Sequence, residues 1–214
     1  MADLTARLWD LQNRHQGDRQ QLFAVVDDAI EATKVLYPGS FVDVAASFVF
    51  DDVTYVDMDK RAAQFFADSA GVRDLIAANT TNTPESDGAL ERRFDFVAAD
   101  YRDPLGLEDE SFDLLVSLYA GFVSEACTNY LKVGGSLLVN PSHGDASMAS
   151  IDDRYQLTAV ILSRSGRYRV SRVGLDSYLV PKRDQEVTPD LLHELGRGIA
   201  YTKTPFAYLF ERVR

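Results

Sequence analysis

Short apolar runs alternate with stretches of helical spacing along the first two thirds of the chain. The apolar runs end at turn residues and predict strands at residues 34–37, 53–56, 94–99, 112–118 and 136–139. Apolar residues three and four apart predict helices at 4–11 and 22–30, from 59 onward, over 72–78 and over 122–131. We expect the Gly134-Gly135 pair to end the last of these helices. Strands that alternate with helices predict βαβ units and a parallel sheet.

The pattern is less regular after residue 140. Two runs, 155–162 and 168–173, flank Ser165-Gly166 and predict a hairpin, although the first run is also compatible with a helix. Thr188-Pro189 is a typical start of a helix, and residues 206–210 predict a last strand. The polar residues 79–91 predict a surface loop within one domain. We therefore predict a single α/β domain over 1–214: N-terminal helices (1–32), a cofactor-binding core (33–140) and a C-terminal part (141–214) that ends a mostly parallel sheet with antiparallel strands.

The charge of the chain narrows its partners. Lys and Arg number 22 against 33 Asp and Glu, which gives a formal net charge of −11 at pH 7. Because an acidic surface repels phosphates and anionic headgroups, we expect a small-molecule substrate and no nucleic-acid or membrane partner. One candidate basic patch exists, and we interpret its spacing as the solvent-facing side of a hairpin. Its residues are Arg164, Arg167, Arg169 and Arg172.

The cysteine, the histidines and the first residues bear on core packing, metal binding and localisation. Cys127 is the only cysteine, and its apolar neighbours at helical spacing predict a core residue. The three histidines have no metal-ligand spacing relative to Asp or Glu, so we predict no bound metal. The first ten residues lack the basic and then apolar run of a signal peptide, and no apolar run approaches the roughly 20 residues that span a bilayer. We expect a cytoplasmic protein of undetermined oligomeric state.

Candidate chemistry lies where the predicted strands end, because parallel sheets bind ligands outside the carboxyl ends of their strands. Asp57 and Asp100 each follow a strand. A carboxylate in the position of Asp57 accepts hydrogen bonds from a ribose diol; the alternative is a helix N-cap, a role for which Asp59 is also available. Asp100 precedes Tyr101 and is suited to an exocyclic amine, or else it forms a turn. These residues predict a nucleoside site.

Three further segments carry a resemblance to a known family. Residues 96–122 read FVAADYRDPLGLEDESFDLLVSLYAGF, with an aspartate after the third strand and DESFD before the fourth, and residues 129–140 contain LKVGG before the fifth. Over residues 34–140 the chain resembles class I S-adenosylmethionine-dependent methyltransferases. The resemblance implies a doubly wound Rossmann-like sheet and S-adenosylmethionine as cofactor. It implies a cofactor site formed by Gly39, Ser40, Asp57, Met58, Asp100, Tyr101 and Ser117.

The resemblance leaves the catalytic residues unknown, because methyl transfer needs mainly alignment. His143, after the fifth strand, is a candidate general base, with an exposed turn residue as the alternative. Tyr119 is a candidate for the methyl-acceptor pocket, or packs against the first loop. The first loop departs from the family: Tyr37 stands where an acid is usual, and Phe41 and Asp43 stand where glycines are usual. Asp43 offers a displaced carboxylate for the ammonium group of the cofactor.

Three functions therefore remain open. The first is a methyltransferase that acts on an unidentified small molecule. The second is a catalytically inactive binding or scaffold domain of the same fold, which the altered first loop suggests. The third is a nicotinamide-dependent oxidoreductase, which the absence of a G-x-G-x-x-G motif disfavours.

Overall fold

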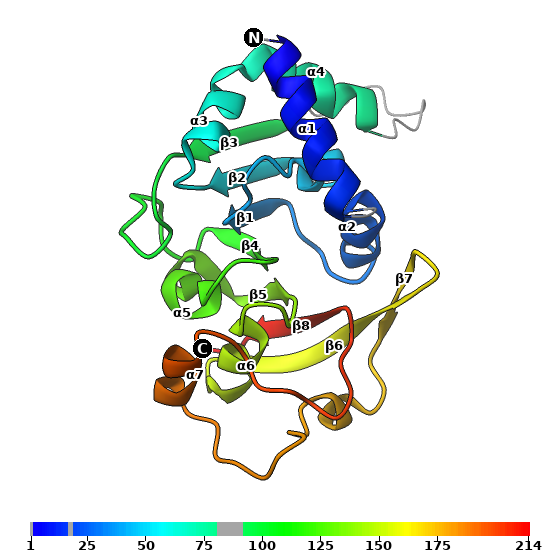
Figure 1. Cartoon of the computed structure of the whole chain (residues 1–214), viewed down its shortest axis with the longest axis vertical. Coiled ribbons are helices and arrows are strands. Elements are labelled where there is room, and N and C mark those ends of the chain that lie inside the picture. The colour runs from blue at the N-terminus through cyan, green and yellow to red at the C-terminus, as the bar shows by residue number, and fades with distance from the viewer. Residues whose placement is uncertain (1, 17–18, 81–91) are drawn as a thin grey trace.

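The computed structural model describes residues 2–16, 19–80 and 92–214, which form an eight-stranded sheet of order β3-β2-β1-β4-β5-β8-β6-β7. Figure 1 shows the strands stacked along the long axis of the molecule from β3 at the top down to β6, with the hairpin of β6 and β7 extending to the right-hand side. The pairings from β3 to β5 are parallel, and β8 pairs antiparallel with both β5 and β6. The predicted doubly wound sheet with an antiparallel finish is confirmed. The strands are β1 (Lys34–Pro38), β2 (Asp52–Val56), β3 (Arg93–Val97), β4 (Phe112–Ser117), β5 (Leu131–Val139), β6 (Tyr155–Arg164), β7 (Arg167–Ser171) and β8 (Ala207–Arg212).

Helices cover both faces of the sheet because successive strand residues point to opposite sides. Val35 and Tyr37 of β1 pack in one core cluster, whereas Leu36 between them packs in the other. The first cluster takes its helical residues from α1 (Ala2–Gln16), α2 (Arg19–Asp27), α3 (Lys60–Ala67), α4 (Ser69–Asn79) and the short 3-10 helix η1 (Ala45–Phe48). The second takes them from α5 (Val123–Cys127), the 3-10 helix η2 (Thr128–Tyr130) and α6 (Asp145–Ile151). Cys127 is a buried core residue, as predicted.

Local signals set where two of the helices begin. The Asp59 side chain accepts a hydrogen bond from the Arg61 amide and caps α3, so Asp57 does not serve as that cap. Thr188 caps α7 (Pro189–Leu195), which has proline in its first turn and ends at Gly196 with φ of 58°. Between β7 and α7 lies one further 3-10 helix, η3 (Leu175–Tyr178).

One predicted helix is wrong in extent. The helix after β4 was expected to run from 122 to 131 and to end at Gly134-Gly135, but α5 ends at Cys127 and β5 already begins at Leu131. The glycine pair lies inside β5, where the register against β4 shifts between Phe112 and Leu114. A Cβ on Gly135 would lie 2.7 Å from Leu131 Cδ1, so the second glycine permits a close approach inside the strand.

Residues 98–111, between β3 and β4, form no helix, and this segment borders the pocket described below. Most of the predicted surface loop at 79–91 lies outside the described residues. Within the described ranges, no helix has the length and apolar character needed to cross a membrane.

Candidate functional site

A pocket of about 320 Å³ opens at the carboxyl edge of the sheet over the ends of β3, β2 and β1, beside the point where the strand order reverses between β1 and β4. Such a switch point is where doubly wound sheets bind their ligands. The ends of β1, β2 and β3 supply the lining. The pocket thereby brings together five of the seven residues predicted for the cofactor site: Gly39, Asp57, Met58, Asp100 and Tyr101. Ala99 and Arg102 complete it.

Asp57 fixes the loop that follows β1. One carboxylate oxygen accepts from the Phe41 amide at 2.8 Å, and the other accepts from the Asp59 amide at 2.8 Å. A carboxylate offers about four lone-pair sites, so two backbone donors leave it capacity for a ligand hydroxyl. Asp57 therefore shapes the pocket and lines it at the same time.

Asp100 is held by a residue that the sequence reasoning did not single out. Its Oδ1 accepts from the Arg102 amide at 3.0 Å, and its Oδ2 accepts from Arg102 Nη2 at 2.5 Å. The hydrogen bonds from Arg102 lower the pKa of the Asp100 carboxyl to about 2, so at neutral pH this carboxylate is ionised and paired with the Arg102 guanidinium. The Arg102 side chain is largely exposed and shares the pocket lining.

The loops after β1 and β4 touch above the switch point. A Cβ placed on Gly39 would lie 2.8 Å from Ala120 Cβ, so the contact depends on glycine. The Tyr101 hydroxyl accepts from the Gly121 amide at 3.2 Å and holds the second loop in place. Phe41 and Tyr119 have φ of 50° and 59°, a left-handed conformation that costs about 1–3 kcal/mol outside glycine. The contact between Gly39 and Ala120 thus narrows the crevice on the side of β4, away from Asp57 and Asp100.

The altered positions of the first loop form a buried polar cluster. Asp43 Oδ2 accepts from the Tyr37 hydroxyl at 3.0 Å and lies 3.8 Å from Arg19 Nε. The three side chains are almost completely buried. Burial raises the pKa of the Asp43 carboxyl, and the Arg19 guanidinium opposes that rise. Asp43 is therefore engaged with the chain itself and does not line the pocket.

Two predicted cofactor residues, Ser40 and Ser117, lie beneath the surface and outside the pocket lining. The Ser40 hydroxyl has no hydrogen-bond partner among the described residues. The Ser117 hydroxyl donates to the carboxylate of Asp145, a residue that the sequence analysis missed. Asp145 also accepts from the Ser124 hydroxyl at 2.5 Å, and burial raises the pKa of its carboxyl to about 6.

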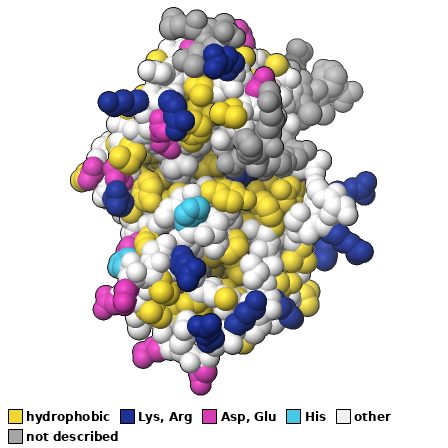
Figure 2. Space-filling model, in the orientation of Figure 1, with side chains coloured by type: hydrophobic (Ala, Val, Ile, Leu, Met, Phe, Trp, Pro, Cys, Tyr) yellow, Lys and Arg dark blue, Asp and Glu magenta, His cyan; other side chains and the backbone are white. Residues whose placement is uncertain are grey.

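The two candidate catalytic residues follow the next strands of the same edge, and neither lines the pocket. Tyr119 is 45% exposed, its amide donates to Asn140 Oδ1 at 3.2 Å, and its ring centroid lies 4.8 Å from the Arg19 guanidinium carbon. His143 is exposed, with Nδ1 2.8 Å from the Ser142 hydroxyl. Figure 2 shows hydrophobic side chains across the middle of this face of the molecule.

Comparison with known proteins finds similar solved structures, all of them at low sequence identity. No protein-family model and no curated protein matches the sequence. Among solved structures, the YcgJ protein from Bacillus subtilis is 17% identical, with 60% of this chain and 54% of that chain covered and a TM-score of 0.42. An rRNA methylase from Streptococcus thermophilus is 10% identical, with 90% and 94% covered and a TM-score of 0.47. A methyltransferase from Geobacter sulfurreducens is 14% identical, with 74% and 83% covered and a TM-score of 0.49.

The chain spans about half the length of the Bacillus subtilis protein. At these identities and TM-scores the similarity carries no conclusion about function. The fold assignment itself rests on the strand order and pairing directions given above.

Proposed function

We propose that this chain binds S-adenosylmethionine in the pocket between Asp57 and Asp100 and is a methyltransferase. The observation that carries the proposal is the pocket itself: it lies beside the switch point, and its two acids follow the neighbouring strands β2 and β3. A nucleoside presents a ribose diol and an exocyclic amine, which are hydrogen-bond donors that two carboxylates accept.

The fit of the cofactor differs between its two ends. The adenosyl end matches the volume and the acids of the pocket, with Met58 and Tyr101 as apolar contacts for the base. At the amino-acid end, the buried Ser40 hydroxyl lacks a hydrogen-bond partner among the described residues, and because it lies outside the pocket lining a ligand reaches it only if the neighbouring loops move. The contact between Gly39 and Ala120 narrows that end, so full occupancy requires the Tyr119–Gly121 segment to move.

When bound, S-adenosylmethionine supplies an activated methyl group on a sulfonium. The residues of the chain would hold and orient it. In this proposal Asp57 accepts from the ribose hydroxyls, Asp100 accepts from the base amine, and Ser40 contacts the amino-acid end. His143 is proposed as the base for an acceptor that loses a proton, and Tyr119 as a wall of the acceptor site. The acceptor was expected to be a small molecule, and this stays a prediction.

A second function is favoured by the buried Tyr37–Asp43–Arg19 cluster and the Gly39–Ala120 contact. These contacts occupy the space beside the loop after β1, where the proposal places the amino-acid end of S-adenosylmethionine. The same pocket would therefore suit a domain that binds an adenosyl group without transferring a methyl group. The two functions differ in one measurable respect, which is whether the amino-acid part of the cofactor adds affinity.

Isothermal titration with S-adenosylmethionine and with 5′-methylthioadenosine, which lacks the amino-acid part, separates them. A methyltransferase binds S-adenosylmethionine more tightly, whereas an adenosyl-binding domain binds both equally. Asp57→Asn and Asp100→Asn should each weaken both ligands, and Asp103→Asn, an exposed acid outside the pocket lining, should change neither. Circular dichroism confirms that the variants fold. Absence of heat from either ligand at millimolar concentration would sink both functions.

A further inference from the structure

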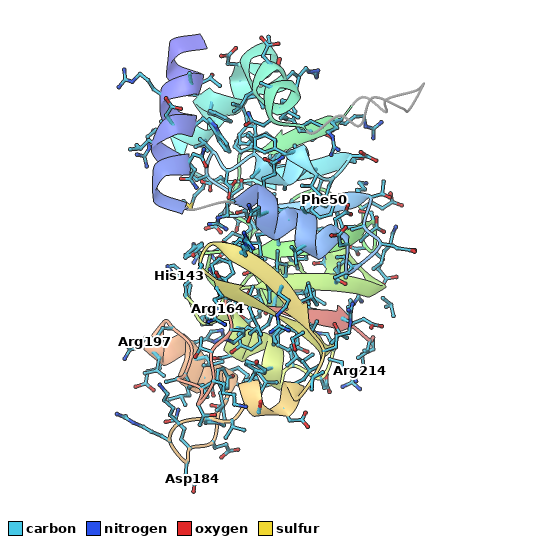
Figure 3. All side chains as sticks on the ribbon, turned by 90° about the vertical axis from the view of Figure 1, so that its right-hand side faces the viewer. Phe50, His143, Arg164, Asp184, Arg197 and Arg214 are labelled. Carbon is cyan, nitrogen blue, oxygen red and sulfur yellow. The ribbon has the colours of Figure 1, made fainter. Side chains whose placement is uncertain are left out.

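The hairpin of β6 and β7 stands at the same edge of the sheet as the pocket. β6 runs antiparallel to β8, which runs antiparallel to β5, so β6 ends on the side where the parallel strands end. Figure 3 shows Arg164, the last residue of β6, on the same side as His143, and Phe50 and Arg214 on the opposite side. The turn Ser165-Gly166 has φ of 52° and 75°, the two left-handed residues of a tight hairpin.

Three arginines share one face of this hairpin. Arg164 pairs directly with Arg167 across the strands, and Leu162 pairs with Arg169. Because side chains alternate along a strand and paired residues share a face, the three arginines lie on one side. All three are exposed, and none forms an ion pair within the described ranges 2–16, 19–80 and 92–214. Figure 2 shows dark blue side chains gathered at the right-hand edge, at the place of this hairpin, with no Asp or Glu beside them on this face.

This arrangement is unfavourable for the chain alone. Like charges directly opposite each other destabilise a strand pair. The chain carries 33 acidic residues against 22 basic ones, yet none of the acids in the described part of the chain forms an ion pair with these three arginines. Arg172, just beyond the end of β7, differs because its Nη2 donates to the Ala29 carbonyl at 2.8 Å. Charged side chains of either sign would protect the edge strand β7 against self-association. Such protection therefore does not explain why all three residues are arginine.

A second group of cations lines a groove beside α7, which lies at the lower left in Figure 1, whereas the hairpin lies at the right-hand edge. The groove has a volume of about 560 Å³, with Leu191, Leu195 and Ile199 as its apolar residues. Its charged lining residues are all basic: Lys182, Arg183 and Arg197. Asp184 and Glu194 belong to the same chain segment but do not line the groove. Figure 3 shows Arg197 on the side of Arg164, and Asp184 at the lower tip of the molecule.

We propose that this surface, formed by the three hairpin arginines and the groove, binds single-stranded RNA. Guanidinium groups bind phosphates in bidentate fashion, and an apolar groove with a basic rim suits an unstacked nucleotide. A membrane fits less well, because residues 163–169 expose no large hydrophobic side chain for insertion. The net charge of the chain argued against nucleic acid, but exposed charges are screened beyond about 8 Å at physiological ionic strength, so a local cluster governs contact. This binding goes beyond the proposed methyl transfer and needs no cofactor.

The test is fluorescence anisotropy with a short, labelled single-stranded RNA of mixed sequence and no cofactor. The variant Arg164→Gln/Arg167→Gln/Arg169→Gln is compared with Arg7→Gln/Arg93→Gln/Arg214→Gln, which changes the net charge equally through exposed arginines elsewhere. For single-stranded nucleic acid, the slope of log affinity against log salt concentration becomes shallower by about 0.7 for each phosphate contact removed. The hairpin variant should therefore lower the slope by about 2 and the affinity about tenfold, and the control should bind within about twofold of the unmodified chain.

Three results would overturn the proposal. The first is that the unmodified chain fails to bind the RNA at micromolar concentration, or binds phosphatidylserine vesicles in its place. The second is that the hairpin variant binds RNA as tightly as the unmodified chain does. The third is that the hairpin variant self-associates in sedimentation while its monomer keeps full RNA affinity, which would assign the arginines to protection of the β7 edge. None of these results bears on S-adenosylmethionine binding, which the calorimetric titration measures separately.

Discussion

Replacement of Asp145 by asparagine should remove a large pH dependence of stability. Asp145 is buried, and its carboxyl pKa is raised from 3.8 to about 6. Asparagine keeps one oxygen to accept from Ser124 and offers an amide that donates to the Ser117 hydroxyl. It therefore preserves the packing among β4, α5 and α6 while it removes the ionisation.

The sign and size of the effect follow from the two pKa values. Well below pH 3.8 the carboxyl is protonated in both the folded and the unfolded chain. As the pH rises, the unfolded chain ionises first, and above pH 6 the folded chain must carry a buried charge. Stability is thus lost as pH rises through this window. A shift of about two units at about 1.4 kcal/mol each corresponds to about 3 kcal/mol.

The assay is urea unfolding followed by circular dichroism from pH 4 to pH 7. The difference in unfolding free energy between Asp145→Asn and the unmodified chain should grow in favour of the variant by about 3 kcal/mol over this range. Asp190→Asn, an exposed acid on α7, serves as the control and should show no such trend. A difference between Asp145→Asn and the unmodified chain that stays constant from pH 4 to pH 7 would refute the reasoning.

Three further predictions concern the pocket and the core. Gly39→Ala should lower the unfolding free energy by about 2 kcal/mol or more, because φ is 67° there and the new Cβ would clash with Ala120. Gly166→Ala, at φ of 75° in open space, should lower it by only about 1 kcal/mol, and thermal unfolding measures both changes. Arg102→Gln should raise the pKa of the Asp100 carboxyl from about 2 toward its ordinary value in an NMR titration; an unchanged pKa would show that Arg102 does not set it. Burial raises the pKa of the Cys127 thiol to about 12, so a disulfide reagent should modify it only at the rate of unfolding, and rapid modification would contradict its place in the core.

The sheet and the position of the pocket were predictable because local signals determine them. β4 is apolar at four of its six positions and buried at five, as expected of a strand covered on both faces. Asp57 and Asp100 each follow a strand, and parallel strands bring their carboxyl ends to one edge whatever lies between them. By contrast, Gly134-Gly135 gave an ambiguous signal, since glycines mark both helix ends and close approaches within strands.

The contacts that fill and narrow the crevice were not predictable, because they join residues far apart in sequence. Arg19 meets Asp43 across an intervening strand, and the Asp145 carboxylate meets serines that precede it by more than 20 residues. The Asp100–Arg102 pair did carry a local signal. The pattern Asp-x-Arg occurs also at Asp59 and at Asp152, and each aspartate accepts from both the amide and the guanidinium two residues later.

The most direct test of the central claim is a crystal structure of the chain grown with S-adenosylhomocysteine. Binding at the switch point predicts density for the adenosyl group over Gly39, with its ribose hydroxyls on Asp57 and its base beside Asp100. It also predicts that the Tyr119–Gly121 segment moves away from Gly39 to admit the amino-acid end. An empty pocket at saturating ligand, or density for the ligand at another site, would contradict the account.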